Sequence, residues 1–163
     1  MTKPRLGVVG ATGAVGTVTL ELLVRRAHTD VHAFASARSA GMEVAFGSQK
    51  LLVEVATPEN LAAARLDLCF FSVGTGPSSE LVPPTAEAGT TCIDKSDAFR
   101  LRDGIPLVVA GVNDHALDRG GIVANPNCSA IQLACVLKPL RDAAGLRRVR
   151  LATYQSMSGA GDE

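Results

Sequence analysis

Apolar and polar positions alternate along the chain in a way that predicts strands and helices in regular succession. Short apolar runs bounded by turn residues predict strands over 6–9, 31–35, 51–55, 68–72, 91–94, 107–109 and 122–124. Helical spacing of apolar residues predicts helices over 14–26, 58–64, 79–87, 113–118 and 128–144. Strands that alternate with helices in this order predict an α/β fold, a doubly wound parallel sheet with helices on both faces.

A glycine-rich turn follows the first predicted strand. Glycines at positions 10, 13 and 16 lead directly into the first predicted helix. Such a strand-turn-helix unit lays a pyrophosphate on a helix amino terminus and is typical of Rossmann-type domains. The spacing is G-x-x-G-x-x-G and not the commoner G-x-G-x-x-G, and a turn that serves packing alone is the alternative. Ligands bind at the carboxyl ends of such strands, so we expect 10–16, 36–39 and 72–78 to converge on one crevice.

The segment after the second predicted strand bears on the choice of cofactor. NAD-binding units carry an acidic residue there for the ribose 2′-hydroxyl, whereas an arginine accommodates the 2′-phosphate of NADP. This chain has Arg38 flanked by Ser36 and Ser39, with no acidic residue. The segment favours NADP over NAD, unless Arg38 is only a solvated surface charge.

A cysteine stands where the last predicted strand gives way to a helix, in the run Asn125-Pro126-Asn127-Cys128-Ser129. Unpaired N–H groups and the partial positive charge of a helix amino terminus favour thiolate over thiol, so Cys128 is a candidate nucleophile. The alternative is that Cys128 is only a helix-start residue. We predict a domain boundary near Asn125, with a cofactor-binding domain over 1–124 and the beginning of a second domain over 125–163.

Composition excludes several classes of protein. The 163 residues carry 16 basic and 16 acidic side chains, a balance that does not suggest a nucleic-acid partner. No apolar run is long enough for a membrane helix and no export signal is visible, so we expect a cytoplasmic protein without a membrane partner. The four cysteines form no C-x-x-C pair and no metal site is expected. Cys69, Cys92 and Cys135 are predicted to be buried apolar residues.

Near the end of the chain, polar and apolar residues alternate over 147–155, which predicts a strand with one covered face. Few residues follow it that could pair with such a strand. The three histidines, His28, His32 and His115, lie far from Cys128 in the sequence, and none is assigned as a catalytic base.

Taken together, the blocks at 10–16, 36–41, 93–100, 125–129 and 154–161 resemble aspartate-semialdehyde dehydrogenase, in the same order along the chain. Members of that family are longer. The resemblance therefore implies the amino-terminal half of such an enzyme, with 125–163 as the start of a truncated α+β catalytic domain. A related N-acetylglutamyl-phosphate reductase is an alternative, although 36–39 and 154–156 fit the aspartate enzyme better.

The resemblance implies a reaction through a thioester, in the biosynthesis of lysine, methionine and threonine. The Cys128 thiolate would attack L-aspartyl 4-phosphate, phosphate would leave, and NADPH would reduce the thioester to L-aspartate 4-semialdehyde. Gln155 matches a residue that orients the substrate, and Arg100 and Asn127 match residues at the substrate phosphate. Cofactor contacts are implied for a larger set of positions: Gly10, Thr12, Gly13, Ala14, Val15, Gly16, Arg38, Ser39, Ser158 and Gly159.

Some features depart from the family pattern. Lys95 and Asp97 stand where the family usually has Asn and Ser, and Gly111 where it usually has Glu. Lys95 is expected either to pair with Asp97 on the surface or to tune substrate choice. The family's catalytic histidine, its carboxylate-binding arginine and most of its homodimer surface come from the other half. We therefore expect weak or no turnover from this chain alone, and a non-catalytic NADP-binding module is the alternative function.

Overall fold

The computed structural model describes residues 3–117 and 120–155. Its strands are β1 (Leu6–Val9), β2 (Val31–Ala35), β3 (Glu43–Phe46), β4 (Gln49–Val55), β5 (Leu68–Phe71), β6 (Thr91–Asp94) and β7 (Ile122–Ala124). Its helices are α1 (Ala14–Arg25), α2 (Pro58–Ala63), α3 (Thr75–Glu87), the single-turn η1 (Asp114–Ala116) and α4 (Cys128–Ala144). The strands form one seven-stranded sheet in the order β3-β4-β2-β1-β5-β6-β7, and only the β3–β4 pair is antiparallel. The predicted α/β fold is confirmed.

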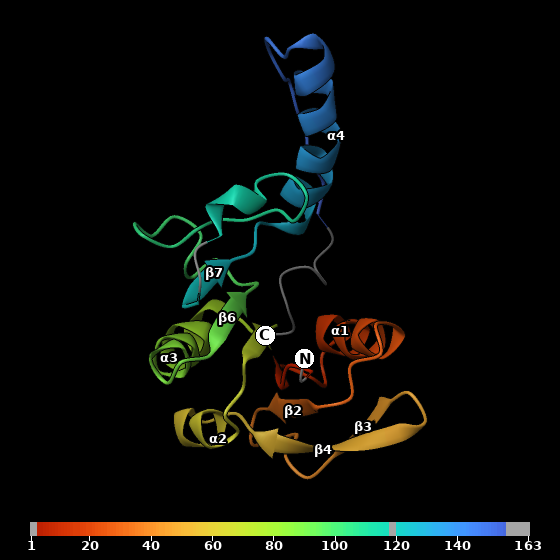
Figure 1. Ribbon diagram of the computed structural model, residues 1–163, viewed down its shortest axis with the longest axis vertical. Coiled ribbons are helices and arrows are strands. Elements are labelled where there is room, and N and C mark those ends of the chain that lie inside the picture. Colours follow the sequence, from red (N-terminus) through yellow and green to blue (C-terminus); the bar gives the residue numbers. More distant parts are fainter. Residues whose placement is uncertain (1–2, 118–119, 156–163) are drawn as a thin grey trace.

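Helices cover the sheet from two sides, as predicted. Figure 1 shows α1 on one side of the strands and α2 with α3 on the other. Each side has its own apolar core, because alternate residues of a strand point to opposite faces. Val8 and Leu20 belong to the core beneath α1, whereas Val9, Phe71 and Val82 belong to the core beneath α2 and α3.

The antiparallel β3–β4 hairpin was missed by the sequence prediction. β3 pairs with the first half of β4 across Gly47 and Ser48, and Gly47 has a positive φ of 62°. Only Phe46 of β3 is buried. Periodicity is a weak signal in a strand of four residues with one buried side chain. The parallel sheet therefore carries an antiparallel edge strand.

Three other predicted elements differ from the structure. The strand predicted over 107–109 is reduced to an isolated bridge between Leu107 and Ala124. The helix predicted over 113–118 is the single turn η1. Helix α3 begins at Thr75, four residues before its predicted start, because Gly76 and Pro77 resemble loop residues although proline is tolerated in a first helical turn.

The region after β7 differs most from expectation. Helix α4 has the predicted bounds, but none of its residues is buried and it extends away from the sheet (Figure 1). Cys135 on this helix is exposed, so the prediction that it is buried was wrong. The strand predicted over 147–155 is also absent: these residues have no regular structure and are exposed throughout. A strand needs a neighbour for its backbone groups, and the described part of the chain supplies none there.

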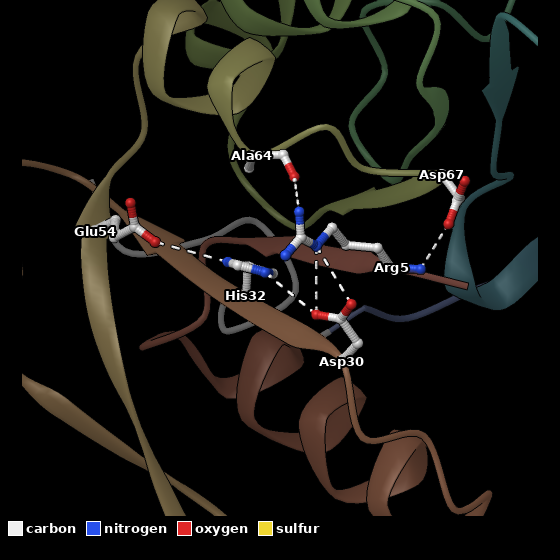
Figure 2. Close-up of polar contacts among 6 residues, drawn as sticks. All are labelled: Arg5, Asp30, His32, Glu54, Ala64 and Asp67. Carbon is white, nitrogen blue, oxygen red and sulfur yellow. Dashed lines mark hydrogen bonds and ion pairs between the residues drawn. The ribbon is translucent and has the colours of Figure 1, made fainter. Parts of the chain in front are cut away.

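An ion-pair network closes the amino ends of the strands. The Arg5 guanidinium lies 3.3 Å from the Asp30 carboxylate and donates a hydrogen bond to the Ala64 carbonyl at 3.2 Å (Figure 2). The Arg5 backbone N–H donates to Asp67 at 2.7 Å. His32 lies between Asp30 and Glu54, at 3.4 and 3.8 Å. These contacts connect the amino ends of β1, β2 and β5, at the end of the strands opposite to the glycine-rich turn.

Candidate functional site

The glycine-rich turn joins β1 to α1 through close backbone packing. Gly10 has a φ of 81°, and a Cβ there would lie 2.3 Å from the Ser72 carbonyl oxygen. A Cβ on Gly16 would lie 2.1 Å from the Gly10 carbonyl oxygen, so the first turn of α1 packs directly on the glycine turn. Gly13 is less constrained, since its Cβ would lie 3.4 Å from the same oxygen. Only glycine fits at positions 10 and 16. These close backbone contacts allow α1 to pack directly against the end of β1.

The helices that begin near this turn lack capping side chains. Neither the Gly13 cap of α1 nor the Gly74 cap of α3 makes a side-chain hydrogen bond, and neither first turn holds an acidic residue. By contrast, Thr57 caps α2 and Asn127 caps α4 through their side chains. The free N–H groups and the helix dipole favour an anion at the amino ends of α1 and α3.

The loops predicted to converge do meet at this edge of the sheet. The Thr12 hydroxyl lies 3.5 Å from the Ser39 hydroxyl, which brings the glycine turn to the loop after β2. Arg38 in that loop is exposed and no described residue pairs with it. At the end of β5, the Ser72 hydroxyl is buried without a hydrogen-bond partner among the described residues. An orphaned hydroxyl beside two uncapped helices fits a polar ligand such as a dinucleotide.

The Cys128 turn has the geometry of a capped helix start. The Asn127 Oδ1 atom accepts a hydrogen bond from the Ser129 backbone N–H at 2.9 Å, so Cys128 is the first residue of α4. Its thiol is exposed, with Sγ 3.9 Å from Asn127 Oδ1. The Asn127 side-chain nitrogen also donates to Gln155 Oε1 at 3.1 Å. The structure thus brings Gln155 to the adjacent residues Asn127 and Cys128, although 27 residues lie between Asn127 and Gln155 in the sequence.

Arg100 is tied to the same turn. Its Nε donates to the Asn125 carbonyl at 3.1 Å and its Nη2 donates to the Lys95 carbonyl at 2.8 Å. The guanidinium is half-buried, and no described residue is a partner for its Nη1 group. Two carbonyls therefore fix the orientation of the guanidinium and leave one side of it free for an anion.

Lys95 does not pair with Asp97, so the expected surface pair was wrong. The Lys95 ammonium donates to the Thr19 hydroxyl of α1 at 2.9 Å and lies 5.8 Å from the centre of the Phe70 ring. Burial lowers its pKa. Asp97 instead accepts a hydrogen bond from the Thr75 hydroxyl at the start of α3. Lys95 therefore contacts α1 and Asp97 contacts α3, and these helices lie on opposite sides of the sheet, which separates the two charges.

The remaining predicted positions are distributed as follows. His28 and His32 lie at the opposite edge of the sheet, where α1 ends and β2 begins, and His115 is exposed in η1. Cys69 and Cys92 are buried, as predicted. Burial raises the pKa of Cys92 to about 12 and that of Cys69 well above its ordinary value. Ser158 and Gly159 lie outside the described residues.

Residues 3–117 and 120–155 contain neither a helix that could span a membrane nor a cluster of metal-binding side chains. No helix there combines the length and the apolar character that a membrane span requires. No three histidine, cysteine, aspartate or glutamate side chains come together there as a possible metal site.

Comparison with known proteins identifies related sequences. Residues 5–119 match the family model for the NAD-binding domain of semialdehyde dehydrogenase. The chain is 44% identical over 161 residues to aspartate-semialdehyde dehydrogenase of Bacillus subtilis, an alignment that covers 97% of this chain and 46% of that protein. The chain therefore spans about half the length of the curated relatives it matches.

The chain is also similar to solved structures of aspartate semialdehyde dehydrogenases. The chain matches aspartate semialdehyde dehydrogenase II of Vibrio cholerae, solved in complex with ASA, with a TM-score of 0.88 and 38% identity. This match covers 98% of the chain and 53% of that protein. It also matches the enzyme of Candida albicans, solved with NADP, with a TM-score of 0.75 and 27% identity over 89% of this chain and 48% of that one.

Proposed function

Because the chain belongs to the semialdehyde dehydrogenase NAD-binding domain family, we propose that it carries the cofactor site and the nucleophilic thiol of an aspartate-semialdehyde dehydrogenase. The observation that carries the proposal is an exposed thiol at a helix start, with Arg100 hydrogen-bonded to the carbonyl of Asn125 in the same turn. The proposed domain boundary lies at this turn, near Asn125, and separates 1–124 from 125–163. The relatives are about twice as long as the matched segment, so the reaction is proposed for an enzyme of their full length.

In the proposed reaction, the Cys128 thiolate attacks the acyl carbon of L-aspartyl 4-phosphate, and phosphate leaves as the thioester forms. Arg100 holds the phosphate through the free side of its guanidinium, which keeps the leaving group beside the thiol. Asn127 and Gln155 are hydrogen-bonded to each other and orient the acyl group at Cys128. A bound nicotinamide cofactor supplies the hydride that converts the thioester to the aldehyde and releases the thiolate.

The proposed cofactor is NADP, and the uncapped helix starts and the orphaned Ser72 hydroxyl support a dinucleotide site. The amino end of α1 would hold the pyrophosphate, with Gly10, Gly13 and Gly16 allowing its close approach. Thr12, Ala14, Val15, Arg38, Ser39, Ser158 and Gly159 complete the proposed set of cofactor residues. Arg38 and Ser39 are the proposed contacts to the 2′-phosphate, because Arg38 is an exposed cation without a described partner.

Alkylation of Cys128 tests the proposal without requiring turnover. Iodoacetate and iodoacetamide differ in charge but react with a thiol in the same way. We expect the anionic reagent to be favoured at Cys128 and inorganic phosphate to protect the thiol, because both anions use Arg100. Arg100→Gln should remove the preference and the protection. The other exposed thiol, Cys135, serves as an internal reference in the same molecule.

Protection by nucleotides tests the choice of cofactor. NADP should change the rate of alkylation at Cys128 at a concentration roughly tenfold or more below that needed for NAD, the value of one charge-assisted hydrogen bond. Arg38→Ala should abolish this difference, and Arg26→Ala, at the far end of α1, should preserve it. If Cys128 reacts like Cys135 with both reagents and ignores NADP and phosphate, the proposal fails and a non-catalytic module remains.

A further inference from the structure

Asp94 is a buried carboxylate that the proposed reaction does not use. It is the last residue of β6 and is completely buried. Its Oδ1 accepts a hydrogen bond from the Ser78 hydroxyl and its Oδ2 accepts one from the Ser96 hydroxyl, both at 2.6 Å. No basic side chain among the described residues pairs with it. A carboxylate is costly to bury without a cation, so this arrangement needs an explanation.

The loop after Asp94 is organised by these contacts. The Ser96 hydroxyl that donates to Asp94 also accepts a hydrogen bond from the Ala98 backbone N–H at 3.1 Å. Ser96 is buried as well. The turn of the backbone between Asp94 and Arg100 is therefore fixed through one hydroxyl group. Two residues further on, Arg100 folds back onto the carbonyl of Lys95 in the same loop.

The same loop is fastened to the Cys128 turn. The Asp94 carbonyl accepts a hydrogen bond from the Asn125 backbone N–H at 2.8 Å, and the Asn125 carbonyl accepts one from Arg100 Nε at 3.1 Å. Both backbone groups of Asn125 are thus bound by the segment from Asp94 to Arg100. A change in the course of this segment moves the guanidinium relative to the thiol three residues after Asn125.

A second connection runs to the start of α3. Ser78 is completely buried, and its bond to Asp94 joins the first turns of α3 to the end of β6. The Thr75 hydroxyl makes a parallel connection to Asp97. Asp94 is therefore the common acceptor for two segments, the amino end of α3 and the loop that carries Arg100.

We propose that Asp94 is a positioning residue: through Ser78 and Ser96 it holds Arg100 in the orientation that presents an anion to Cys128. This inference rests on the proposed function, because it takes Arg100 to be the anion-binding group beside the thiol. Asp94 is completely buried, so the proposed role is an indirect one, exerted through the hydroxyl groups of Ser78 and Ser96. This role accounts for a buried carboxylate at the end of β6 whose partners among the described residues are two hydroxyl groups.

The test uses Ser96, which links the carboxylate to the loop. Ser96→Ala removes the hydroxyl and leaves Asp94 Oδ2 and the Ala98 N–H without a partner, whereas Ser96→Thr keeps a hydroxyl at the same position. The readout is the preference of Cys128 for iodoacetate over iodoacetamide, normalised to Cys135. We expect Ser96→Ala to lower the preference by about fivefold to tenfold, the value of a well-placed charge-assisted hydrogen bond. Ser96→Thr should restore it.

A matched control separates positioning from a general loss of stability. Thr90→Val removes another buried hydroxyl, which donates to the Leu66 carbonyl at 2.9 Å at the opposite end of β6. It should destabilise the chain and leave the preference at Cys128 unchanged. If Ser96→Ala does not fold, Asp94→Asn provides the second variant, since it keeps the size of the side chain and replaces one acceptor with a donor.

The outcomes distinguish the two proposals. If the parent chain shows no preference for the anion, the anion site at Arg100 does not exist, and both proposals fail. If Arg100→Gln removes the preference while Ser96→Ala and Asp94→Asn retain it, the proposed function stands and the positioning role of Asp94 is overturned. If Thr90→Val lowers the preference as much as Ser96→Ala does, the effect is one of stability and the positioning role is likewise overturned.

Discussion

Replacing Gly16 by alanine tests whether the glycine-rich turn is held by backbone packing. An alanine Cβ would lie 2.1 Å from the Gly10 carbonyl oxygen and 2.8 Å from the Ala11 Cα. Both neighbours are backbone atoms, so no side chain can rotate away. Relief requires α1 to move from β1 by nearly 1 Å, because carbon contacts below 3.0 Å are essentially never observed.

The expected cost follows from two opposing effects. Overpacking a well-packed site costs about 1–3 kcal/mol, and a clash between backbone atoms belongs at the upper end of that range. Alanine in place of glycine inside a helix contributes roughly 1 kcal/mol in the other direction. The free energy of unfolding should therefore fall by about 2 kcal/mol in Gly16→Ala.

Urea unfolding followed by circular dichroism measures this change, with two other glycines as controls. A Cβ on Gly13 would meet only the Gly10 carbonyl at 3.4 Å, and a Cβ on Gly76 in α3 would meet nothing within 4 Å. Gly13→Ala, at the N-cap of α1, should lower stability by roughly 0.5–1 kcal/mol, and Gly76→Ala should raise it by up to about 1 kcal/mol. With a slope of about 1–3 kcal/mol per molar urea, the midpoint for Gly16→Ala should fall by roughly 1 M.

One result would refute this reasoning. If Gly16→Ala unfolds at the same urea concentration as Gly13→Ala, then α1 can move without cost and the close contact at Gly10 is not a constraint. Nucleotide binding adds a second measure, because displaced α1 N–H groups no longer converge on a phosphate. A variant that keeps full stability but loses NADP binding would indicate a role for Gly16 in the ligand site and not in packing.

Three further predictions concern titration and capping. Since burial raises the pKa of Cys92 to about 12, the unfolded chain releases this proton first above its ordinary pKa of 9.0, and stability falls as pH rises from 9 to 12; Cys92→Ala should flatten that fall in urea unfolding. Since burial lowers the pKa of Lys95, the folded chain loses this proton first, so stability rises with pH between that lowered pKa and 10.5. Any increase in the free energy of unfolding in Lys95→Met should then be largest at neutral pH and should shrink toward pH 10.5. Urea unfolding at several pH values measures this change. Asn127→Ala should weaken the start of α4 by about 1 kcal/mol, whereas Asn127→Asp keeps the acceptor; hydrogen exchange of the Ser129 amide distinguishes the two.

Much of the fold could be predicted because it depends on local pattern. The strands over 6–9, 31–35, 91–94 and 122–124 have the predicted bounds, since each is a short apolar run between turn residues. The glycine-rich turn was also predictable, because only glycine tolerates the φ of Gly10 and the contact at Gly16. Helix α4 was predicted with its full extent, from the start at Cys128 to the glycine at 145.

Features that depend on partners distant in the sequence could not be predicted in this way. The alternation over 147–155 indicates a strand, yet a strand forms only where a neighbour accepts its backbone hydrogen bonds. Cys135 has the apolar surroundings of a buried residue in the sequence, but α4 packs none of its residues in a core. Likewise, the contact between Ser78 and Asp94 joins α3 to β6, and no spacing rule connects these two residues.

The departures from the family pattern at positions 95 and 97 bear less on the anion site than their charges suggest. Arg100 is held by the main-chain carbonyl of residue 95, and this contact does not depend on the side chain there. The Lys95 side chain extends to Thr19 on α1, and Asp97 is held by Thr75 of α3. Both charges are thus engaged by helices on opposite faces of the sheet, and the guanidinium keeps its free side. Substitution of Lys95 should therefore alter stability and its pH dependence while the preference of Cys128 for an anionic reagent persists.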